Sequence, residues 1–299
     1  MIEYAARHKF YAQDIAMNQL FVNNLTVIDF SYFDNQRGIL GESWNVDIEL
    51  TGELDHQGMV FDFGHVKKKI KSIIDCELDH RFVMTKSAKN FDMKREGSNT
   101  LLAWQNVMGS YQHTSPHEAI LVLDIKTVNP KSIATYLQDV ILKALPDNIK
   151  DVSIKLSQEE IDGAYYHYSH GLKKHDGNCQ RIVHGHRSKI EIYENHQRNQ
   201  ILEDYWSACF RNIYIGTRED ISRESTLDGK EHITFSYTAL QGEFSVTLPK
   251  KRVYILDTDT TVELIADHIA QACTQKKPNN HYRVKAFEGI GKGSIATSK

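Results

Sequence analysis

The sequence predicts an α+β protein built from two copies of one structural plan. Stretches typical of strands and helices follow the order strand, strand, helix, β-rich insertion, helix, strand, and this order occurs twice in the 299 residues. Ile133-Ala134 in the first half aligns with Ile265-Ala266 in the second, and the same offset aligns Leu78–Val83 with Phe210–Ile215. We therefore expect a tandem duplication with its seam near Asp162-Gly163, giving domains of residues 1–162 and 163–299.

Local patterns place the elements of the first half. The predicted elements are strands at 21–33 and 43–54, a helix from 64 to about 78, a β-rich region at 99–127, a helix from 130 and a strand from 151. The first helix has its apolar residues on one face, and the lysines at 67–69 and 71 fall mostly on the solvated side; the apolar residues are Val66, Ile70, Ile73 and Ile74. The second helix begins with Pro130 at its first position, where the missing N–H is tolerated.

Composition and charge limit the partners that this chain could bind. The chain is 40% hydrophobic and 25% charged with a formal net charge of −3, which argues against nucleic acid or an anionic membrane as the main partner. The sequence shows no apolar run long enough for a membrane span and no signal-peptide pattern at its start. Four cysteines without paired spacing indicate reduced thiols, so we expect a cytoplasmic protein. Cys76, Cys209 and Cys273 are expected to pack on apolar helix faces.

The stretch HGLKKHDGNCQRIVHGH, from His170 to His186, contains a candidate metal site. His184 and His186 open an alternating stretch typical of a strand, so their imidazoles would point to the same face. His170 ends another β-rich run and would add a third nitrogen if the two strands pair. Three histidines with a fourth position open are the ligand set of a catalytic zinc, and Cys179 lies near enough to act beside it. The alternative is an ordinary histidine pair on a surface strand.

Further motifs accompany this stretch: Gly58–Gly64 (GMVFDFG), Leu78-Asp79-His80, and Glu288 in VKAFEG. Together with the histidines and Cys179 they resemble the family of 6-pyruvoyl-tetrahydropterin synthase and 6-carboxytetrahydropterin synthase, which has the tunnelling fold (T-fold). The resemblance implies an antiparallel sheet with two helices on one face in each repeat, and repeats packed edge to edge into a barrel. It also implies a homo-oligomer with active sites shared between subunits.

The family motifs are divided between the two halves. The first half keeps the DFG turn and Asp79-His80, but it has FSYFDN at 30–35 and Leu40-Gly41-Glu42 at the metal positions. We therefore expect no zinc site in the first half. The second half has the histidines, Cys179 and Glu288, but Arg211-Asn212 replaces Asp79-His80. This complementarity favours one active site completed by two unlike repeats.

The resemblance also implies a role for each site residue. Zn²⁺ held by His170, His184 and His186 would act as a Lewis acid on the hydroxyl groups of a substrate side chain. Cys179 would be a base or proton shuttle, with an inert loop residue as the alternative. Glu288 would accept two hydrogen bonds from the amino group and ring N–H of a pterin.

Asp79 and His80 would form a carboxylate–imidazole pair for proton transfer. Adjacent residues at a helix end rarely face each other, so the pair is also interpreted as working with Cys179 of another repeat, or as capping the helix. Lys173, Lys174 and Arg187 are either contacts for a triphosphate tail or ordinary solvated charges.

The implied function is that of a zinc-dependent lyase acting on 7,8-dihydroneopterin triphosphate, a small-molecule substrate. The product would be 6-carboxytetrahydropterin for deazaguanine (queuosine) synthesis. The alternatives are 6-pyruvoyl-tetrahydropterin, formed without side-chain cleavage, and a non-catalytic pterin- or zinc-binding scaffold. A third variant of the family carries glutamate in place of the cysteine, and Cys179 speaks against it.

Overall fold

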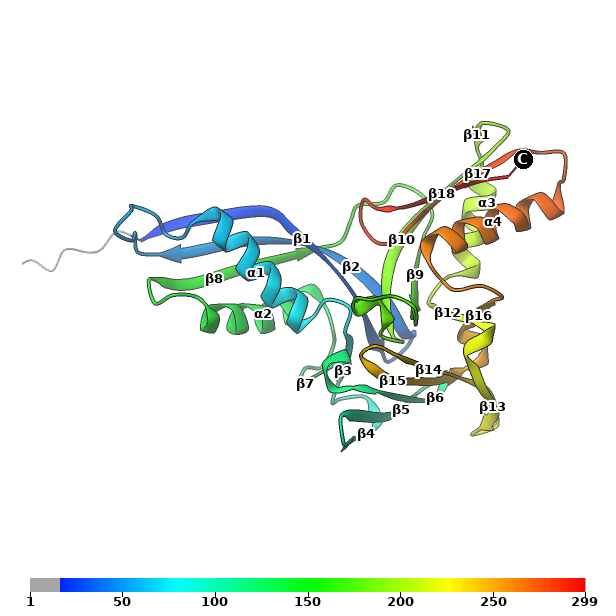
Figure 1. The fold of residues 1–299 in the computed structure, drawn as a ribbon, viewed down its shortest axis with the longest axis horizontal. Helices are drawn as coiled ribbons and strands as arrows, with labels where there is room; N and C mark the ends of the chain where they lie inside the picture. The colour runs from blue at the N-terminus through cyan, green and yellow to red at the C-terminus, as the bar shows by residue number, and fades with distance from the viewer. Residues whose placement is uncertain (1–16, 299) are drawn as a thin grey trace, which may run out of the picture.

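A computed structural model of the protein describes residues 17–298. The molecule is elongated, with one sheet and its helices at each end and a third sheet beneath the junction (Figure 1). No helix in the described part of the chain is long and apolar enough to cross a membrane. The predicted α+β class is confirmed by this mixture of sheets with the four α-helices found within residues 17–298.

The first sheet has the strand order β7-β3-β1-β2-β8 and belongs to the first repeat. Its strands are β1 (Asn18–Asp34), β2 (Gly38–Gly52), β3 (Phe82–Thr85), β7 (Ile120–Leu123) and β8 (Ile149–Ser157). The β1–β2 hairpin and β8 are antiparallel, as expected. However, β3 and β7 add to the β1 edge in parallel, because a crossover through a helix or insertion precedes each of them.

The second sheet repeats this arrangement with the order β16-β12-β9-β10-β17-β18, and β11 pairs with β10. Its strands are β9 (Tyr165–His170), β10 (His184–Glu194), β11 (Gln197–Arg198), β12 (Ile213–Thr217), β16 (Val253–Leu256), β17 (Tyr282–Phe287) and β18 (Gly293–Thr297). The predicted boundary between residues 162 and 163 falls in the segment that joins β8 to β9.

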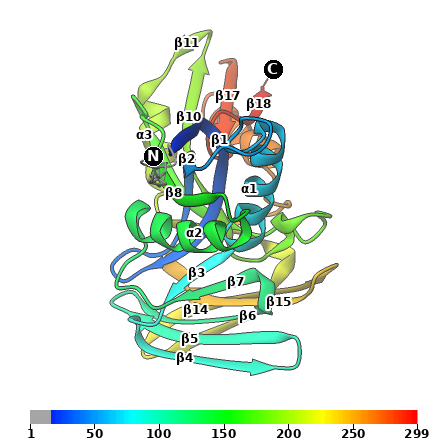
Figure 2. The ribbon, with the colours of Figure 1, turned by 90° about the vertical axis from the view of Figure 1, so that its left-hand side faces the viewer.

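The helices cover one face of each main sheet (Figures 1 and 2). They are α1 (Phe63–Glu77), α2 (Pro130–Ala144), α3 (Gln200–Cys209) and α4 (Val262–Lys276). Asp62 of the DFG turn caps α1 by accepting a hydrogen bond from the His65 N–H, and Asn129 starts α2 with a capping box followed by Pro130. Both caps fix the helix starts where the sequence predicts them.

The apolar stripes of the helices form two separate cores, one for each repeat. In α1 the core residues are Val66, Ile70 and Ile74, and the lysines at 67–69 and 71 are exposed as predicted. Cys273 is buried in α4, whereas the prediction for Cys76 is wrong because Cys76 is exposed. Cys76 follows Ile74 by two positions, which turns it about 200° away from the buried stripe.

The two β-rich insertions form one sheet that joins the repeats, with the order β13-β14-β15-β6-β5-β4. Its strands are β4 (Lys89–Glu96), β5 (Asn99–Asn106), β6 (Gly109–Pro116), β13 (Ile221–Leu227), β14 (Lys230–Ala239) and β15 (Gly242–Pro249). The joint is antiparallel pairing of β15 with β6, where Val246 faces His113. Edge-to-edge packing therefore occurs within this sheet, and the two main sheets do not pair with each other within residues 17–298.

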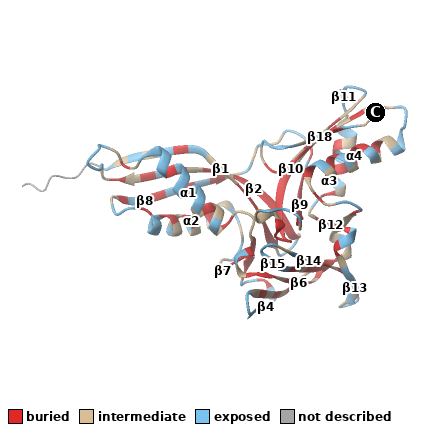
Figure 3. Ribbon diagram, in the orientation of Figure 1, coloured by how far each residue is buried: buried red, intermediate tan, exposed pale blue. Residues whose placement is uncertain are grey.

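The main sheets instead meet where their hairpins cross, in the most buried part of the molecule (Figure 3). Ser31 of β1 and Ser169 of β9 share a hydrogen bond of 2.7 Å between their hydroxyl groups. Gly41 and Gly185 lie back to back, because a Cβ built on Gly185 would lie 2.8 Å from the Gly41 Cα. Two glycines at this point let the backbones of the repeats touch.

Candidate metal and acid–base site

The three predicted histidines meet at the hairpin crossing. His170 ends β9 directly opposite His184 at the start of β10, and His186 lies two positions further on the same strand. All three side chains are buried, with exposed fractions of 0%, 0% and 1%. Each offers a ring nitrogen within 4.8 Å of the other two. Strand alternation and cross-strand pairing thus bring the three imidazoles together.

The outer nitrogens of His170 and His184 are hydrogen-bonded to the protein, and that of His186 lies against a carboxylate without hydrogen-bond geometry. His170 Nδ1 donates to the Thr260 carbonyl at 2.9 Å, and His184 Nδ1 donates to the Arg181 carbonyl at 2.9 Å. His186 Nδ1 lies 3.1 Å from Asp29 Oδ1. Metal-binding histidines usually have such a partner, which fixes the tautomer and leaves Nε2 as the ligand.

The inner nitrogens fit a metal ion. Nε2 of His170, His184 and His186 is buried and has no hydrogen-bond partner in the part of the chain that the structure describes. Burial lowers the pKa of His170 and His184 well below the usual value, so both rings are neutral with a free lone pair. Three converging nitrogens without partners suit a zinc ion that keeps further positions open.

Asp79 and His80 of the first repeat reach this same group of histidines. The ring of His80 packs on that of His184 with 5.2 Å between centroids, and Asp79 Oδ2 lies 2.6 Å from His80 Nδ1. The expectation that these adjacent side chains would not face each other is therefore wrong. His80 has φ of 56°, and this left-handed turn after α1 brings its ring beside the Asp79 carboxylate.

Cys179 lies on the other side of His80, in a short 3₁₀ turn at Asn178–Gln180. Its sulfur and one ring nitrogen each of His80 and His184 lie within 4.8 Å of one another. Burial lowers the pKa of His80, but hydrogen bonds with Asp79 and Cys179 outweigh burial and raise it to about 10. A single chain therefore brings a carboxylate, an imidazole and a thiol from different repeats into one row.

Asp29 in β1 links Asp79 and His80 to the histidines, and it is not among the site residues predicted from the sequence. Its N–H donates to Asp79 Oδ1 at 2.9 Å, and its carbonyl accepts the His80 N–H at 2.7 Å. Its carboxylate contacts His186 and lies 2.9 Å from Lys292 Nζ. Burial would raise the pKa of Asp29, but the neighbouring His186 and Lys292 hold it well below its usual range. Its only sequence signal is one acidic residue within an apolar strand.

Glu288 lies at the open side of the site, in the loop that follows β17. Its Oε1 is 3.9 Å from His186 Nε2, and about a quarter of the side chain (24%) is exposed. The loop is held by a hydrogen bond from the Glu288 N–H to the Lys292 carbonyl. The two lysines considered above as contacts for a triphosphate tail are already paired: Lys173 forms an ion pair with Asp220, and Lys174 with Asp259.

The corresponding positions of the first repeat carry different chemistry. Tyr32 faces Leu40 across the β1–β2 hairpin as His170 faces His184, and Glu42 takes the position of His186. Burial raises the pKa of Glu42 to about 7, and its carboxylate accepts hydrogen bonds from Ser43 and Gln158. Within residues 17–298, two groups of side chains could hold a metal ion, and both include His184 of the second repeat.

Comparison with known proteins assigns the family. The model of the 6-pyruvoyl tetrahydropterin synthase family matches residues 4–169, more than half of the chain. The chain therefore belongs to the 6-pyruvoyl tetrahydropterin synthase family. The matched range ends at Ser169, so the three histidines and Cys179 lie beyond it.

Curated relatives and solved structures of this family resemble part of the chain. A candidate 6-carboxy-5,6,7,8-tetrahydropterin synthase from Pyrococcus horikoshii is 24% identical over 132 residues, which is 44% of this chain and 76% of the relative. One from Methanocaldococcus jannaschii is 26% identical over 133 residues, 43% of this chain and 78% of the relative. The crystal structure of Plasmodium vivax 6-pyruvoyl tetrahydropterin synthase covers 49% of this chain and 94% of its own, at 18% identity and a TM-score of 0.39.

Proposed function

We propose that this protein is a cytoplasmic, zinc-dependent lyase that converts 7,8-dihydroneopterin triphosphate to 6-carboxytetrahydropterin in deazaguanine (queuosine) synthesis. The observation that carries the proposal is the group of three buried Nε2 atoms without partners, next to the row of Asp79, His80 and Cys179. Family membership supports a pterin as the substrate. The names of the Pyrococcus and Methanocaldococcus relatives support the carboxy product over the pyruvoyl product.

His170, His184 and His186 are the proposed zinc ligands. When bound, zinc supplies Lewis acidity toward the hydroxyl oxygens of the substrate side chain. The buried partners of the three Nδ1 atoms keep the rings oriented, so little reorganisation is needed when the metal binds. Thr260 and Arg181 provide two of these partners through carbonyl groups, which no side-chain substitution removes.

Cys179 and His80 are the proposed proton-transfer groups. Cys179 takes a proton from a side-chain carbon or hydroxyl of the substrate, and His80, in hydrogen-bond contact with it, exchanges that proton. Asp79 holds the His80 ring in place by accepting a hydrogen bond from Nδ1. Cys179 and His80 act together within one chain. We also propose a homo-oligomer, and this part of the proposal rests on the family resemblance alone.

Glu288 is the proposed anchor of the pterin ring. Its partly exposed carboxylate lies beside His186, so a ring held by its two oxygens would place the side chain over the histidines. A carboxylate matches the two adjacent N–H donors of a pterin, and its charge strengthens both hydrogen bonds.

The test follows pterins by mass spectrometry after the zinc-loaded protein is incubated with 7,8-dihydroneopterin triphosphate. We expect 6-carboxytetrahydropterin; 6-pyruvoyl-tetrahydropterin would instead support the runner-up product. Cys179→Ala should lower turnover by about 100-fold or more while zinc content stays unchanged. Cys76→Ala is the matched control, because Cys76 is exposed on α1.

Two results would contradict the proposal. Unchanged substrate with a fully zinc-loaded protein would favour a non-catalytic pterin- or zinc-binding scaffold. Normal turnover by Cys179→Ala would remove this residue from the mechanism and leave family membership intact.

A further inference from the structure

The duplication gives the chain a second cleft, formed by the first-repeat hairpin and the end of α3. Arg211-Asn212 occupies the position there that Asp79-His80 occupies at the metal site. Asn212 and His80 both have φ of 56°, so the two helix ends make the same left-handed turn. In the first-repeat hairpin the positions of the candidate metal ligands carry Tyr32, Leu40 and Glu42, and none of these three side chains lines the cleft. The second cleft therefore keeps the framework of the site without its metal chemistry.

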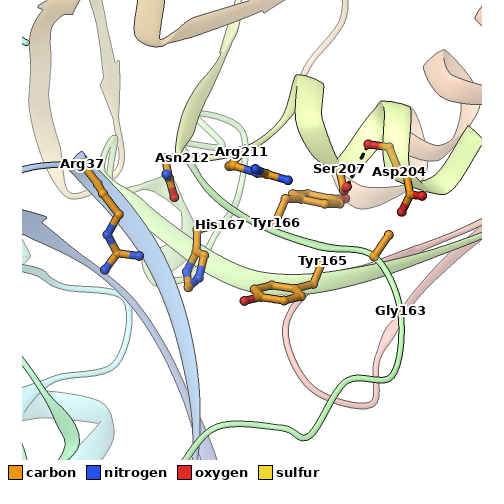
Figure 4. Close-up of a pocket in the computed structure, with 10 residues that line it drawn as sticks. Arg37, Gly163, Tyr165, Tyr166, His167, Asp204, Ser207, Arg211 and Asn212 are labelled. Carbon is orange, nitrogen blue, oxygen red and sulfur yellow. Dashed lines mark hydrogen bonds between the residues drawn. The ribbon is translucent and has the colours of Figure 1, made fainter. Parts of the chain in front are cut away.

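The cleft holds a cavity of about 420 Å³ (Figure 4). The polar and aromatic side chains that line it come from the turn before β2, from β9 and from the end of α3: Arg37, Tyr165, His167, Ser207, Arg211 and Asn212. A volume of this size suits a small organic molecule rather than a single ion.

The charge around the cavity favours an anion. The guanidinium of Arg211 is exposed and makes no hydrogen bond or ion pair with any other residue of 17–298. Arg187 is buried over the Tyr165 ring at 4.4 Å and donates to the Glu159 carbonyl. Asp34 neutralises Arg37 in part, and Asp204, which also lines the cavity, accepts from Gln200. Arg211 is thus a cation at the cavity without a partner among residues 17–298, and a guanidinium fork matches phosphate or carboxylate oxygens.

His167 adds a hydrogen-bond acceptor. Its Nδ1 donates to the Gly41 carbonyl at 2.8 Å, and burial lowers its pKa to about 4. The ring is therefore neutral near pH 7, and Nε2 is left to accept a hydrogen bond. A ligand that carries only acceptors would leave this nitrogen without a donor.

We propose that this second cleft binds a small organic anion, whose phosphate or carboxylate group contacts Arg211 and Arg37. An N–H or O–H group of the same ligand donates to His167 Nε2. Because the cleft has neither metal ligands nor an acid–base pair, it binds this ligand without converting it. The proposal goes beyond the lyase activity and does not depend on it.

Calorimetric titration of the full-length, zinc-loaded protein tests the proposal with two probes, inorganic triphosphate and citrate, at low salt. We expect at least one probe to bind, and Arg211→Gln to weaken that binding by about tenfold or more, as expected for a lost charged hydrogen-bond pair. Arg223→Gln is the matched control, because it removes an exposed arginine from β13. Binding of triphosphate alone would identify a phosphate ligand, and binding of citrate alone a carboxylate ligand.

A tungstate-soaked crystal then locates the anion, with density beside Arg211 and Arg37 as the expected result. The proposal is overturned if neither probe binds, if Arg211→Gln and Arg223→Gln bind alike, or if tungstate occupies only other positions. An anion bound at the zinc site would still bind to the Arg211→Gln variant, so this variant tells the two sites apart. The distinction holds even if the protein proves inactive as a lyase.

Discussion

Asp29→Asn should weaken zinc binding without disturbing the fold. Asn has nearly the shape of Asp, and the backbone hydrogen bonds of Asp29 to Asp79 and His80 stay in place. What is lost is the negative charge 3.1 Å from His186 Nδ1. That charge makes the His186 ring a better ligand and holds it in one orientation.

The size of the effect follows from the position of Asp29 beside one of the three proposed zinc ligands, His186. Loss of such a partner typically costs roughly 10–100-fold in metal affinity, which is about 1.4–2.7 kcal/mol. The upper end is expected here, because Asp29 is 2% exposed and Lys292 would be left without its carboxylate.

Competition with a chromophoric chelator measures the zinc affinity of the variant and the parent. Asp47→Asn is the control for charge loss, because Asp47 also lies in the first sheet but accepts a side-chain hydrogen bond, among residues 17–298, only from the Asn24 N–H. Zinc affinity of Asp29→Asn within twofold of the parent, with the same thermal unfolding, would refute the role assigned to Asp29.

Two further predictions concern stability. Gly41→Ala should destabilise the protein by about 3 kcal/mol in denaturant unfolding, because the new Cβ would collide with the backbones of Tyr168 and His186, which have no room to move aside. Glu194 should stabilise the fold above pH 4.5: hydrogen bonds from Lys277 and other donors lower its pKa from 4.5 to about 2. This contribution is complete above pH 4.5 and is lost as pH falls toward 2, so Glu194→Gln should flatten the acid side of the stability profile.

Each stability prediction has a control. Gly64→Ala adds a methyl group at the exposed start of α1, 3.2 Å from the Asp62 side chain, which can shift, so it should change stability much less than Gly41→Ala. A Gly41→Ala variant as stable as the parent would mean that the hairpins separate easily. Equal pH profiles for Glu194→Gln and the parent would show that the hydrogen bonds to Glu194 contribute nothing to stability.

Local signals in the sequence were enough to predict the repeat and the histidine group. The alternation from His184 to His186 and the β-rich run that ends at His170 determine which side chains share a face, and the strand register then places them opposite each other. The caps at Asp62 and Asn129 act within one turn of the chain, which is why the helix starts are also predictable.

Features that depend on contacts between repeats were not predictable. Asp29 meets His186 only because two hairpins cross, and no periodicity in either strand indicates that crossing. The facing side chains of Asp79 and His80 depend on a positive φ, which histidine adopts rarely. Strand-like patterns at 99–127 likewise do not indicate that β6 will pair with a strand of the other repeat.

The pairing of β6 with β15 has a consequence for synthesis on the ribosome. When the first repeat has emerged, β6 presents an open row of backbone N–H and C=O groups, and its partner has not yet been translated. Such an edge can pair with a neighbouring nascent chain. The first repeat is therefore most exposed to aggregation during translation of the stretch between the two strands, and truncation before Gly242 would make that exposure permanent.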